Sequence, residues 1–290
     1  MFASPEDVVQ EYSNGRLTKF DGNVINYDSV GNPTNYNGNT LTWLGKQLKK
    51  FRSSDGSYTE YEYDINGLRT QKRKYTSSNE LEYAVDYVWS DGKIAYQSLN
   101  YPLTITINGN DVTQNLKIDS KFIYADGEQT PCAIMMNGQE FLLVRNLLGD
   151  VTALILADSG ETIAEFTYSP WGEVTYNIND EQYNTNLTFP SANFFSQYQE
   201  LQAYRKLLQA IVTALCPVSY RGYNYDYTTG LYYLQARYYN PAWGRFINAD
   251  DTSILLSTTG TLHGANLYAY CNNNPINKVD YSGKDTNIII

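Results

Sequence analysis

Aromatic and acidic residues alternate along the chain with the two-residue period of a β-strand. In SYTEYEYD, residues 57–64, the side chains of Thr59, Tyr61 and Tyr63 share one face, and the acidic side chains share the other with Tyr58. The preceding segment LKKFRSS, residues 48–54, ends at the Asp55-Gly56 pair. These two segments are therefore predicted to be the arms of a β-hairpin.

Asn-Gly and Asp-Gly pairs punctuate the chain, and each pair supplies the positive φ angles that a tight two-residue turn requires. Asn-Gly begins at positions 14, 37, 66, 108 and 137, Asp-Gly begins at 21, 55, 91 and 126, and Ser-Gly begins at 159. Most gaps between successive pairs are 11 to 25 residues, which suits short strands joined by turns. The expected fold is all-β and built from antiparallel hairpins.

A degenerate repeat aligns on several of these turns. Each copy has an aromatic residue, a polar residue, a few further residues, a glycine and then another strand. Repetition of this kind predicts stacked units that cover one another's apolar faces. The copies are NYDSVGNPTNY (26–36), EYDINGLRTQK (62–72), VRNLLGDVTAL (144–154), TYSPWGEVTYN (167–177) and NYDYTTGLYYL (224–234).

One segment departs from the strand pattern. The apolar residues of SQYQELQAYRKLLQAIVTALCP recur at helical spacing, and Ser196 and Gln199 occupy the positions of a capping box. We expect one amphipathic helix near 197–215, packed by its apolar stripe onto the sheet within an insertion at 179–217. The residues of the stripe are Leu201, Tyr204, Leu208, Ile211 and Leu215.

Composition narrows the possible functions. The formal net charge of −10 in 290 residues argues against binding to nucleic acid, which depends on lysine and arginine. The first ten residues have neither the basic region nor the apolar run of a signal peptide, so none is expected among them, and no apolar run is long enough to predict a membrane span. The cysteines at 132, 216 and 271 form no metal or disulfide signature, and no phosphate-binding loop or cofactor motif is present.

The C-terminal third carries a specific resemblance. RGYNYDYTTGLYYLQARYYNPAWGRFINADD (221–251) and NLYAYCNNNPINKVDYSG (266–283) closely resemble the repeat-associated core of Rhs/YD-repeat proteins, and residues 10–178 resemble their repeats more loosely. The resemblance implies a β-sheet wound into a hollow shell, similar to the shells of teneurins and of insecticidal toxin complexes. It divides the chain into a YD-repeat region (1–178), the insertion (179–217) and the core (218–290).

The same resemblance implies candidate chemistry. In bacterial members the shell encloses a variable C-terminal toxin, which is released by aspartyl self-cleavage. The core of these proteins carries two Asp-Pro-x-Gly motifs, and cleavage follows the second. The first motif corresponds to NADDTS, in which Asp250 is kept and Asp251 replaces proline. The second corresponds to KVDYSGK, in which Asp280 and Gly283 are kept and a tyrosine replaces proline.

Two mutually repelling carboxylates can share a proton and so activate water against a peptide carbonyl. Asp250 and Asp280 could form such a dyad, aided by Arg245 or, in its place, Arg237, with cleavage after Gly283 or Lys284. The alternative is that both aspartates are turn residues that accept hydrogen bonds from nearby backbone N–H groups.

Three functions remain open. The first is a scaffold, in which the chain is the closing part of a shell in a longer secreted or cell-surface protein that also carries upstream repeats and a C-terminal toxin cargo. The second is a module that binds a glycan or a cell-surface partner on aromatic faces, with Trp43 and Trp89 as stacking rings. The third is the self-cleaving protease. None of them requires a metal or a cofactor.

Overall fold

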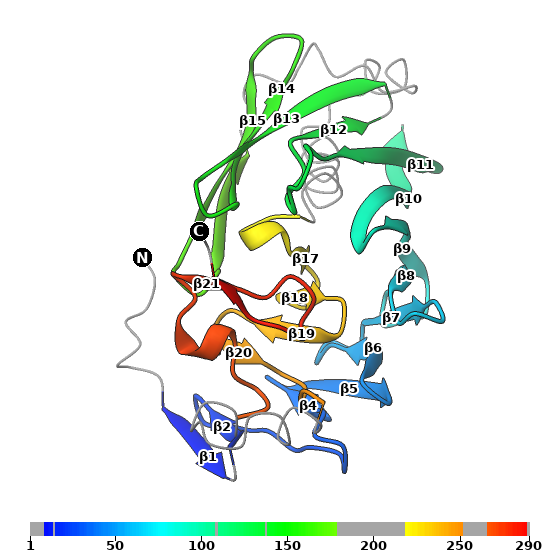
Figure 1. Ribbon diagram of the computed structural model, residues 1–290. Helices are drawn as coiled ribbons and strands as arrows, with labels where there is room; N and C mark the ends of the chain where they lie inside the picture. The colour runs from blue at the N-terminus through cyan, green and yellow to red at the C-terminus, as the bar shows by residue number, and fades with distance from the viewer. Residues whose placement is uncertain are drawn as a thin grey trace. The chain divides into compact units, whose positions relative to one another are not determined.

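The computed structural model describes residues 9–13, 15–107, 110–136, 138–178, 218–251 and 266–288. Regular structure in these ranges is almost entirely antiparallel β-sheet, which confirms the all-β prediction (Figure 1). The helix expected at 197–215 lies outside the described residues. The chain forms two compact units, one of Met1–Leu81, Ser169–Glu173 and Thr228–Ile290, the other of Glu82–Tyr168 and Val174–Tyr227.

The first unit contains a run of strands from the N-terminal repeats, and β4 to β8 pair consecutively in chain order. Short strands from the C-terminal part of the chain complete it. Its strands are β1 (Gln10–Ser13), β2 (Arg16–Phe20), β3 (Asn23–Val24), β4 (Asn35–Tyr36), β5 (Asn39–Leu44), β6 (Gln47–Arg52), β7 (Tyr58–Tyr63), β8 (Arg69–Tyr75), β18 (Leu231–Leu234), β19 (Arg237–Asn240), β20 (Arg245–Phe246), β21 (Lys278–Val279) and β22 (Asn287–Ile288).

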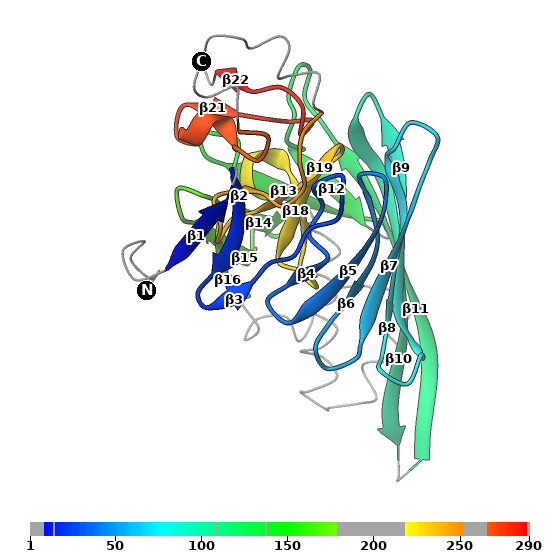
Figure 2. The ribbon, with the colours of Figure 1, turned by 90° about the horizontal axis from the view of Figure 1, so that it is seen from below.

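The second unit is a second run of consecutive hairpins. Its longest hairpin, formed by β10 and β11, extends well past the end of β9 (Figure 2). Phe141, Ile134 and Leu154 are fully buried in a core that the strands of this unit share. The strands are β9 (Leu81–Ser90), β10 (Lys93–Ile107), β11 (Asn110–Ile123), β12 (Ala133–Met136), β13 (Gln139–Arg145), β14 (Val151–Leu156), β15 (Thr162–Tyr168), β16 (Val174–Ile178) and β17 (Asn224–Asp226).

The hairpin predicted around Asp55-Gly56 is present, because β6 pairs with β7 in antiparallel register. Its loop has three residues between paired Ser53 and Ser57, not two, and only the glycine adopts a positive φ angle. Two-residue turns with both φ angles positive do occur, at Asp21-Gly22, Asn37-Gly38 and Asp91-Gly92. The dipeptide thus marks the turn correctly but does not fix its length.

A shared turn explains the repeat. Its first residue is Asp or Asn, whose side-chain oxygen accepts hydrogen bonds from the backbone N–H groups two and four residues later. The glycine in the fourth position donates its N–H to the carbonyl of the first residue. The acceptors and their distances are Asp28 Oδ1 (3.0 Å to Val30, 2.8 Å to Asn32), Asp64 Oδ1 (2.9 Å to Asn66, 2.8 Å to Leu68) and Asn146 Oδ1 (2.9 Å to Leu148, 3.0 Å to Asp150). We call this element the Asp turn.

The tyrosine that precedes the Asp turn also has a structural role. Its ring is partly buried and its hydroxyl donates a hydrogen bond to a backbone carbonyl of an earlier strand. Tyr27 bonds the carbonyl of Leu17 at 2.8 Å, and Tyr63 bonds that of Leu48 at 2.8 Å. The tyrosine and the aspartate of the repeat therefore meet two separate needs. The tyrosine hydroxyl donates to a carbonyl of an earlier strand, and the aspartate accepts from the N–H groups of its own turn.

A second set of tyrosines belongs to the C-terminal part of the first unit. These tyrosines contact repeat turns that lie earlier in the chain. Each hydroxyl in this set donates to the carbonyl oxygen of a glycine in a repeat turn, and each ring is buried. A buried carbonyl without a partner is costly, so these hydroxyls stabilise the turns. The pairs are Tyr268 with Gly31 (2.9 Å), Tyr233 with Gly67 (3.1 Å) and Tyr232 with Gly172 (2.8 Å).

Candidate functional site

Arg237 lies at the centre of a buried cluster of charged groups in the first unit. It is the first residue of β19, directly after a tight turn in which Gln235 has a φ angle of 59°. Only 5% of its side chain is exposed. Its guanidinium stacks on the ring of Phe246 at 3.6 Å, which fixes the plane of the group.

This guanidinium joins the two predicted aspartates. Nη1 of Arg237 lies 2.9 Å from Oδ2 of Asp250, and Nη2 lies 3.2 Å from Oδ2 of Asp280. Asp250 follows β20, and its N–H donates to the carbonyl of Leu267 at 2.9 Å. Asp280 directly follows β21 and is 1% exposed. The fold thus brings together two carboxylates that are 30 positions apart in the sequence.

The peptide bond between Gly283 and Lys284 is held at both ends. Nε of Arg237 donates to the carbonyl oxygen of Gly283 at 2.5 Å, and the N–H of Lys284 donates to Oδ1 of Asp280 at 3.1 Å. The N–H of Gly283 donates to the same Oδ1 atom at 2.8 Å. Asp280 therefore makes the local hydrogen bonds that its interpretation as a turn residue predicts, and it also faces a predicted cleavage position.

Burial dominates the electrostatics of the cluster. It raises the pKa of Asp280 to about 6, although the charge of Arg237 and the two backbone N–H donors act in the opposite direction. The pKa of Asp250 is also raised, again by burial and against the effect of Arg237. Asp280 can therefore hold a proton in mildly acidic solution.

Arg245 occupies a different environment. Its guanidinium lies 4.8 Å from the ring centroid of Tyr12 and 5.9 Å from that of Tyr268. Among the described residues, the ion pairs of Asp250 and Asp280 are made with Arg237. The ion pairs that the hypothesis expected first of Arg245 are thus made by the alternative candidate, Arg237, and a catalytic role of either arginine stays a prediction. No local signal in the sequence distinguishes the two arginines.

The two candidate stacking rings are both half-buried. The indole N–H of Trp43 donates to the carbonyl of Pro33 at 2.6 Å, and its ring packs edge-on against Tyr238. Trp89, in the second unit, packs against the buried core of that unit. Both contacts are structural, and glycan binding by these rings stays a prediction.

Within the described ranges, no group of three or more His, Cys, Asp or Glu side chains could hold a metal ion. Cys132 and Cys271 are free thiols, and Cys216 lies outside those ranges. A helix long and apolar enough to cross a membrane does not occur in the part of the chain that the structure describes.

Comparison with known proteins gives relatives over nearly the whole chain. The chain is 32% identical over 273 residues to the tRNA3(Ser)-specific nuclease WapA of Bacillus spizizenii and 31% identical over 273 residues to the tRNA nuclease WapA of Bacillus subtilis. Each alignment covers 92% of this chain but only 9% of the relative. No family model matches the chain.

The fold is also similar to a solved structure. The crystal structure of TcdB2-TccC3-TEV matches 95% of this chain with a TM-score of 0.51 at 18% identity, and the match covers 13% of that chain. At this level of identity the likeness concerns the fold alone. It shows that a fold like this one occurs as a small part of a much longer chain.

Proposed function

Because the chain belongs to the Rhs/YD-repeat family, we propose that it is a structural segment of the shell of an Rhs-type polymorphic toxin. In this proposal it is part of a longer secreted or cell-surface protein. Its hairpins form part of the wall around a C-terminal effector.

The observation that carries this proposal is the use of tyrosine hydroxyls and Asp turns as structural elements. Tyr232, Tyr233 and Tyr268 are buried, and their hydroxyls bond turn carbonyls. The hydroxyls of these three tyrosines, which a binding surface would expose, are instead engaged in holding hairpins together. A chain whose hairpins are held together in this way is suited to form part of the wall of a shell.

Protection of the effector tests the proposal in the longer protein that contains the chain. A protease-sensitive sequence placed in the effector should resist digestion while the shell is intact, and should be cut once the shell is unfolded in urea. The same sequence placed in an exposed turn, at Asp21-Gly22, serves as the control and should be cut under both conditions. Equal cleavage at both positions in the native protein would contradict the proposal.

A second candidate function is self-cleavage between Gly283 and Lys284, and the contacts of this peptide bond favour it. In this proposal Asp250 takes a proton from water, and the resulting hydroxide adds to the Gly283 carbonyl, which Arg237 polarises. Protonated Asp280 then delivers its proton to the nitrogen of Lys284. The C–N bond breaks, water is consumed, and a carboxylate and an amine are formed.

The intact mass of the chain with a C-terminal tag tests self-cleavage. The proposal predicts a fragment that ends at Gly283, and the fragment should be absent from Asp280→Asn and strongly reduced in Arg237→Lys. Arg245→Lys is the matched control, since Arg245 makes no ion pair with either carboxylate in the described structure. An uncut mass for the parent chain over the range from pH 5 to pH 8 would leave only the turn role for Asp280.

A further inference from the structure

The solvent-facing side of β13 and β14, which lie side by side in the second unit (Figure 1), carries apolar residues. Along β13, Leu142 and Val144 alternate with Phe141 and Leu143. Phe141 and Leu143 are buried in the core of the unit, whereas Leu142 and Val144 are each 41% exposed. Because successive side chains of a strand point to opposite faces, Leu142 and Val144 lie on the face that the core does not cover.

The strand register makes these residues part of one surface. Leu142 lies directly opposite Ile155 on β14, and Val144 lies opposite Ala153. Ile155 and Ala153 are both partly exposed. Side chains directly opposite each other in an antiparallel pair have Cβ atoms only about 4.5–5.5 Å apart, so these side chains are contiguous. We call this set, Leu142, Val144, Ala153 and Ile155, the apolar patch.

Carboxylates border the apolar patch. Glu165 on β15 lies directly opposite Ala153 and is exposed. Glu140 lies two positions before Leu142 on β13 and therefore shares its face. Neither carboxylate forms an ion pair with a residue in the part of the chain that the structure describes.

The turn between β14 and β15 adds two further carboxylates, those of Asp158 and Glu161. The N–H of Ala157 donates to the carbonyl of Glu140 at 2.9 Å, so this turn lies beside Glu140. Asp158 and Glu161 also make no ion pair within the described ranges. Negative charge is therefore concentrated at this end of the patch.

Cations do not balance these carboxylates. Arg145, next to Val144, is paired with Glu128 at 3.1 Å. Lys121 makes no ion pair with a described residue, but Met135 lies between Lys121 and Glu140 in the strand register. Even when Lys121 is counted against Glu140, the other three bordering carboxylates are left without a cation among the described residues.

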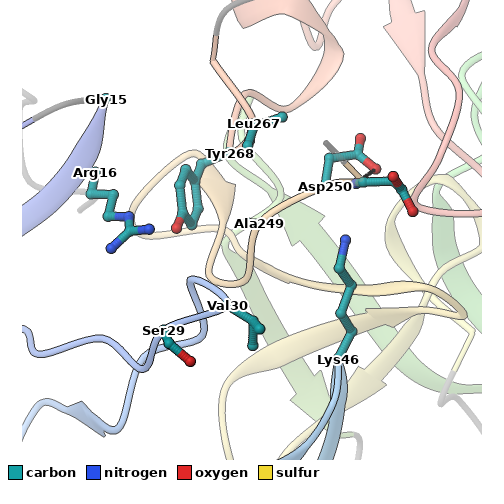
Figure 3. A pocket seen from close by; sticks show the side chains of 10 residues that line it. Gly15, Arg16, Ser29, Val30, Lys46, Ala249, Asp250, Leu267 and Tyr268 are labelled. Carbon is teal, nitrogen blue, oxygen red and sulfur yellow. Dashed lines mark hydrogen bonds between the residues drawn. The ribbon is translucent and has the colours of Figure 1, made fainter. Parts of the chain in front are cut away.

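The pocket beside Asp250 in the first unit, about 420 Å³ in volume, has no such excess of charge (Figure 3). Its charged groups and those that contact them balance, because Arg237 is shared by Asp250 and Asp280. The three cations are Arg16, Lys46 and Arg237, and the three carboxylates are Asp250, Asp251 and Asp280. Charge therefore distinguishes the apolar patch from this pocket.

We propose that the apolar patch docks a segment of a protein partner that presents apolar side chains beside lysine or arginine. The apolar side chains of the partner pack on Leu142, Val144 and Ile155, and its cations pair with Glu140 and Glu165 at the border. The same face of a second copy would bring like charges together in a two-fold contact, and an anionic lipid surface would be repelled. The charge of the border thus selects a basic partner.

Fluorescence anisotropy tests the proposal with a set of labelled helical peptides. The basic peptide consists of leucine and lysine, with the leucines on one face of the helix. The acidic peptide has glutamate in place of each lysine, and the polar peptide has glutamine in place of each leucine. The basic peptide should bind at least about tenfold more tightly than either of the others. Equal affinity for the basic peptide and either of the others would overturn the proposal, and this comparison does not depend on how any variant folds.

Matched variants locate the surface. Leu142→Gln should weaken binding of the basic peptide by about tenfold, whereas Val88→Gln, at a residue of β9 that is 56% exposed, should bind like the wild type. Glu165→Lys should also weaken binding by about tenfold, whereas Glu82→Lys makes the same change in net charge on β9 and should have little effect. Equal effects within each pair would contradict the proposal, because a general attraction to the acidic chain would then account for the binding.

The oligomeric state of the chain tests the other occupant. Analytical ultracentrifugation at the concentrations of the binding assay should show a monomer. A dimer that is lost in Leu142→Gln, with circular dichroism like that of the wild type, would identify a second copy as the occupant and would overturn the proposal.

Discussion

Nε of Arg237 donates a hydrogen bond of 2.5 Å to the carbonyl oxygen of Gly283. The same guanidinium holds Asp250 and Asp280 with its two other nitrogens. One side chain therefore ties three separate segments of the first unit together and is surrounded by acceptors. Its loss would leave two carboxylates without their cation in a buried environment.

Arg237→Gln is expected to lower the free energy of unfolding by about 3–5 kcal/mol, because breaking a buried ion pair leaves an uncompensated charge. Urea unfolding of the purified chain measures the loss. Arg73→Gln is the matched control, since Arg73 pairs with Glu62 at the surface and its removal should cost at most about 1 kcal/mol. If both variants are equally stable, the cluster does not contribute to stability as described.

How far this cluster could be predicted depends on the range of its contacts. Asp280 and Gly283 are three positions apart and form a local turn, and the sequence pattern identified both. Arg237 reaches Asp280 only because β19 lies beside the segment after β21, and no pattern along the chain encodes that contact. The sequence therefore offered two arginines and could not choose between them.

The strands and turns were more accessible to prediction. The alternation of aromatic and acidic residues within 57–64 and the turn at Asp55-Gly56 each involve only neighbouring positions in the sequence. These local signals therefore identified β7 and its hairpin with β6. The turn at Asp64 is equally local. The hydrogen bond from Tyr233 to Gly67 joins positions 166 residues apart and was beyond the reach of the sequence pattern.

The stability of the first unit should depend on the protonation of Asp280. Burial raises the pKa of Asp280 in the folded chain to about 6 from an ordinary value of 3.8, so the folded state binds the proton more tightly than the unfolded state. This contribution to stability is complete below about pH 4 and is lost as the pH rises through about 6. The free energy of unfolding of the wild type, relative to that of Asp280→Asn, should therefore fall between pH 4 and pH 7.

Urea titrations of both proteins at pH 4, 5, 6 and 7 measure this difference. Since all other titrating groups are common to the two proteins, their effects largely cancel. A wild-type advantage that grows with pH over this interval would show that the pKa of Asp280 is lowered in the folded state, contrary to the effect of burial.

Gly283→Ala should be strongly destabilising. Gly283 has a φ angle of +70°, and a Cβ atom there would lie 2.6 Å from the carbonyl oxygen of Leu234 and 3.0 Å from the backbone nitrogen of Arg237. Backbone atoms cannot move aside cheaply, so a loss of about 2–4 kcal/mol is expected. Gly22→Ala, at φ +79° with no atom within 4 Å, isolates the conformational cost and should lose only about 1 kcal/mol. Thermal melts of the two variants provide the comparison.

The Asp turn predicts different outcomes for two substitutions of one residue. Asp64→Ala removes the acceptor of the N–H groups of Asn66 and Leu68, and should cost about 1–2 kcal/mol. Asp64→Asn should cost much less, because Asn146 makes the same pair of bonds in another turn. Chemical denaturation of both variants separates the hydrogen bonds from the charge, and equal losses would show that the charge matters more.

Tyr233→Phe removes a hydroxyl that donates to the carbonyl of Gly67 and accepts the N–H of Arg69. Tyr233 is 2% exposed, so water cannot readily replace either bond, and a loss of about 1–3 kcal/mol is expected. Tyr12→Phe, at a ring that is 52% exposed, is the control and should be nearly neutral. A neutral result at both positions would mean that the buried hydroxyl adds nothing to the turn.

The hydroxyls of Tyr232, Tyr233 and Tyr268 have a consequence for biosynthesis. The ribosome makes the turns at Gly31 and Gly67 long before it makes the tyrosines that satisfy their carbonyls. Until those side chains leave the exit tunnel, the early hairpins lack partners for these groups and stay open to rearrangement. The first unit can therefore acquire its final stability only after these tyrosines have been made, so a ribosome that stalls before Tyr232 would release a chain whose early hairpins cannot mature.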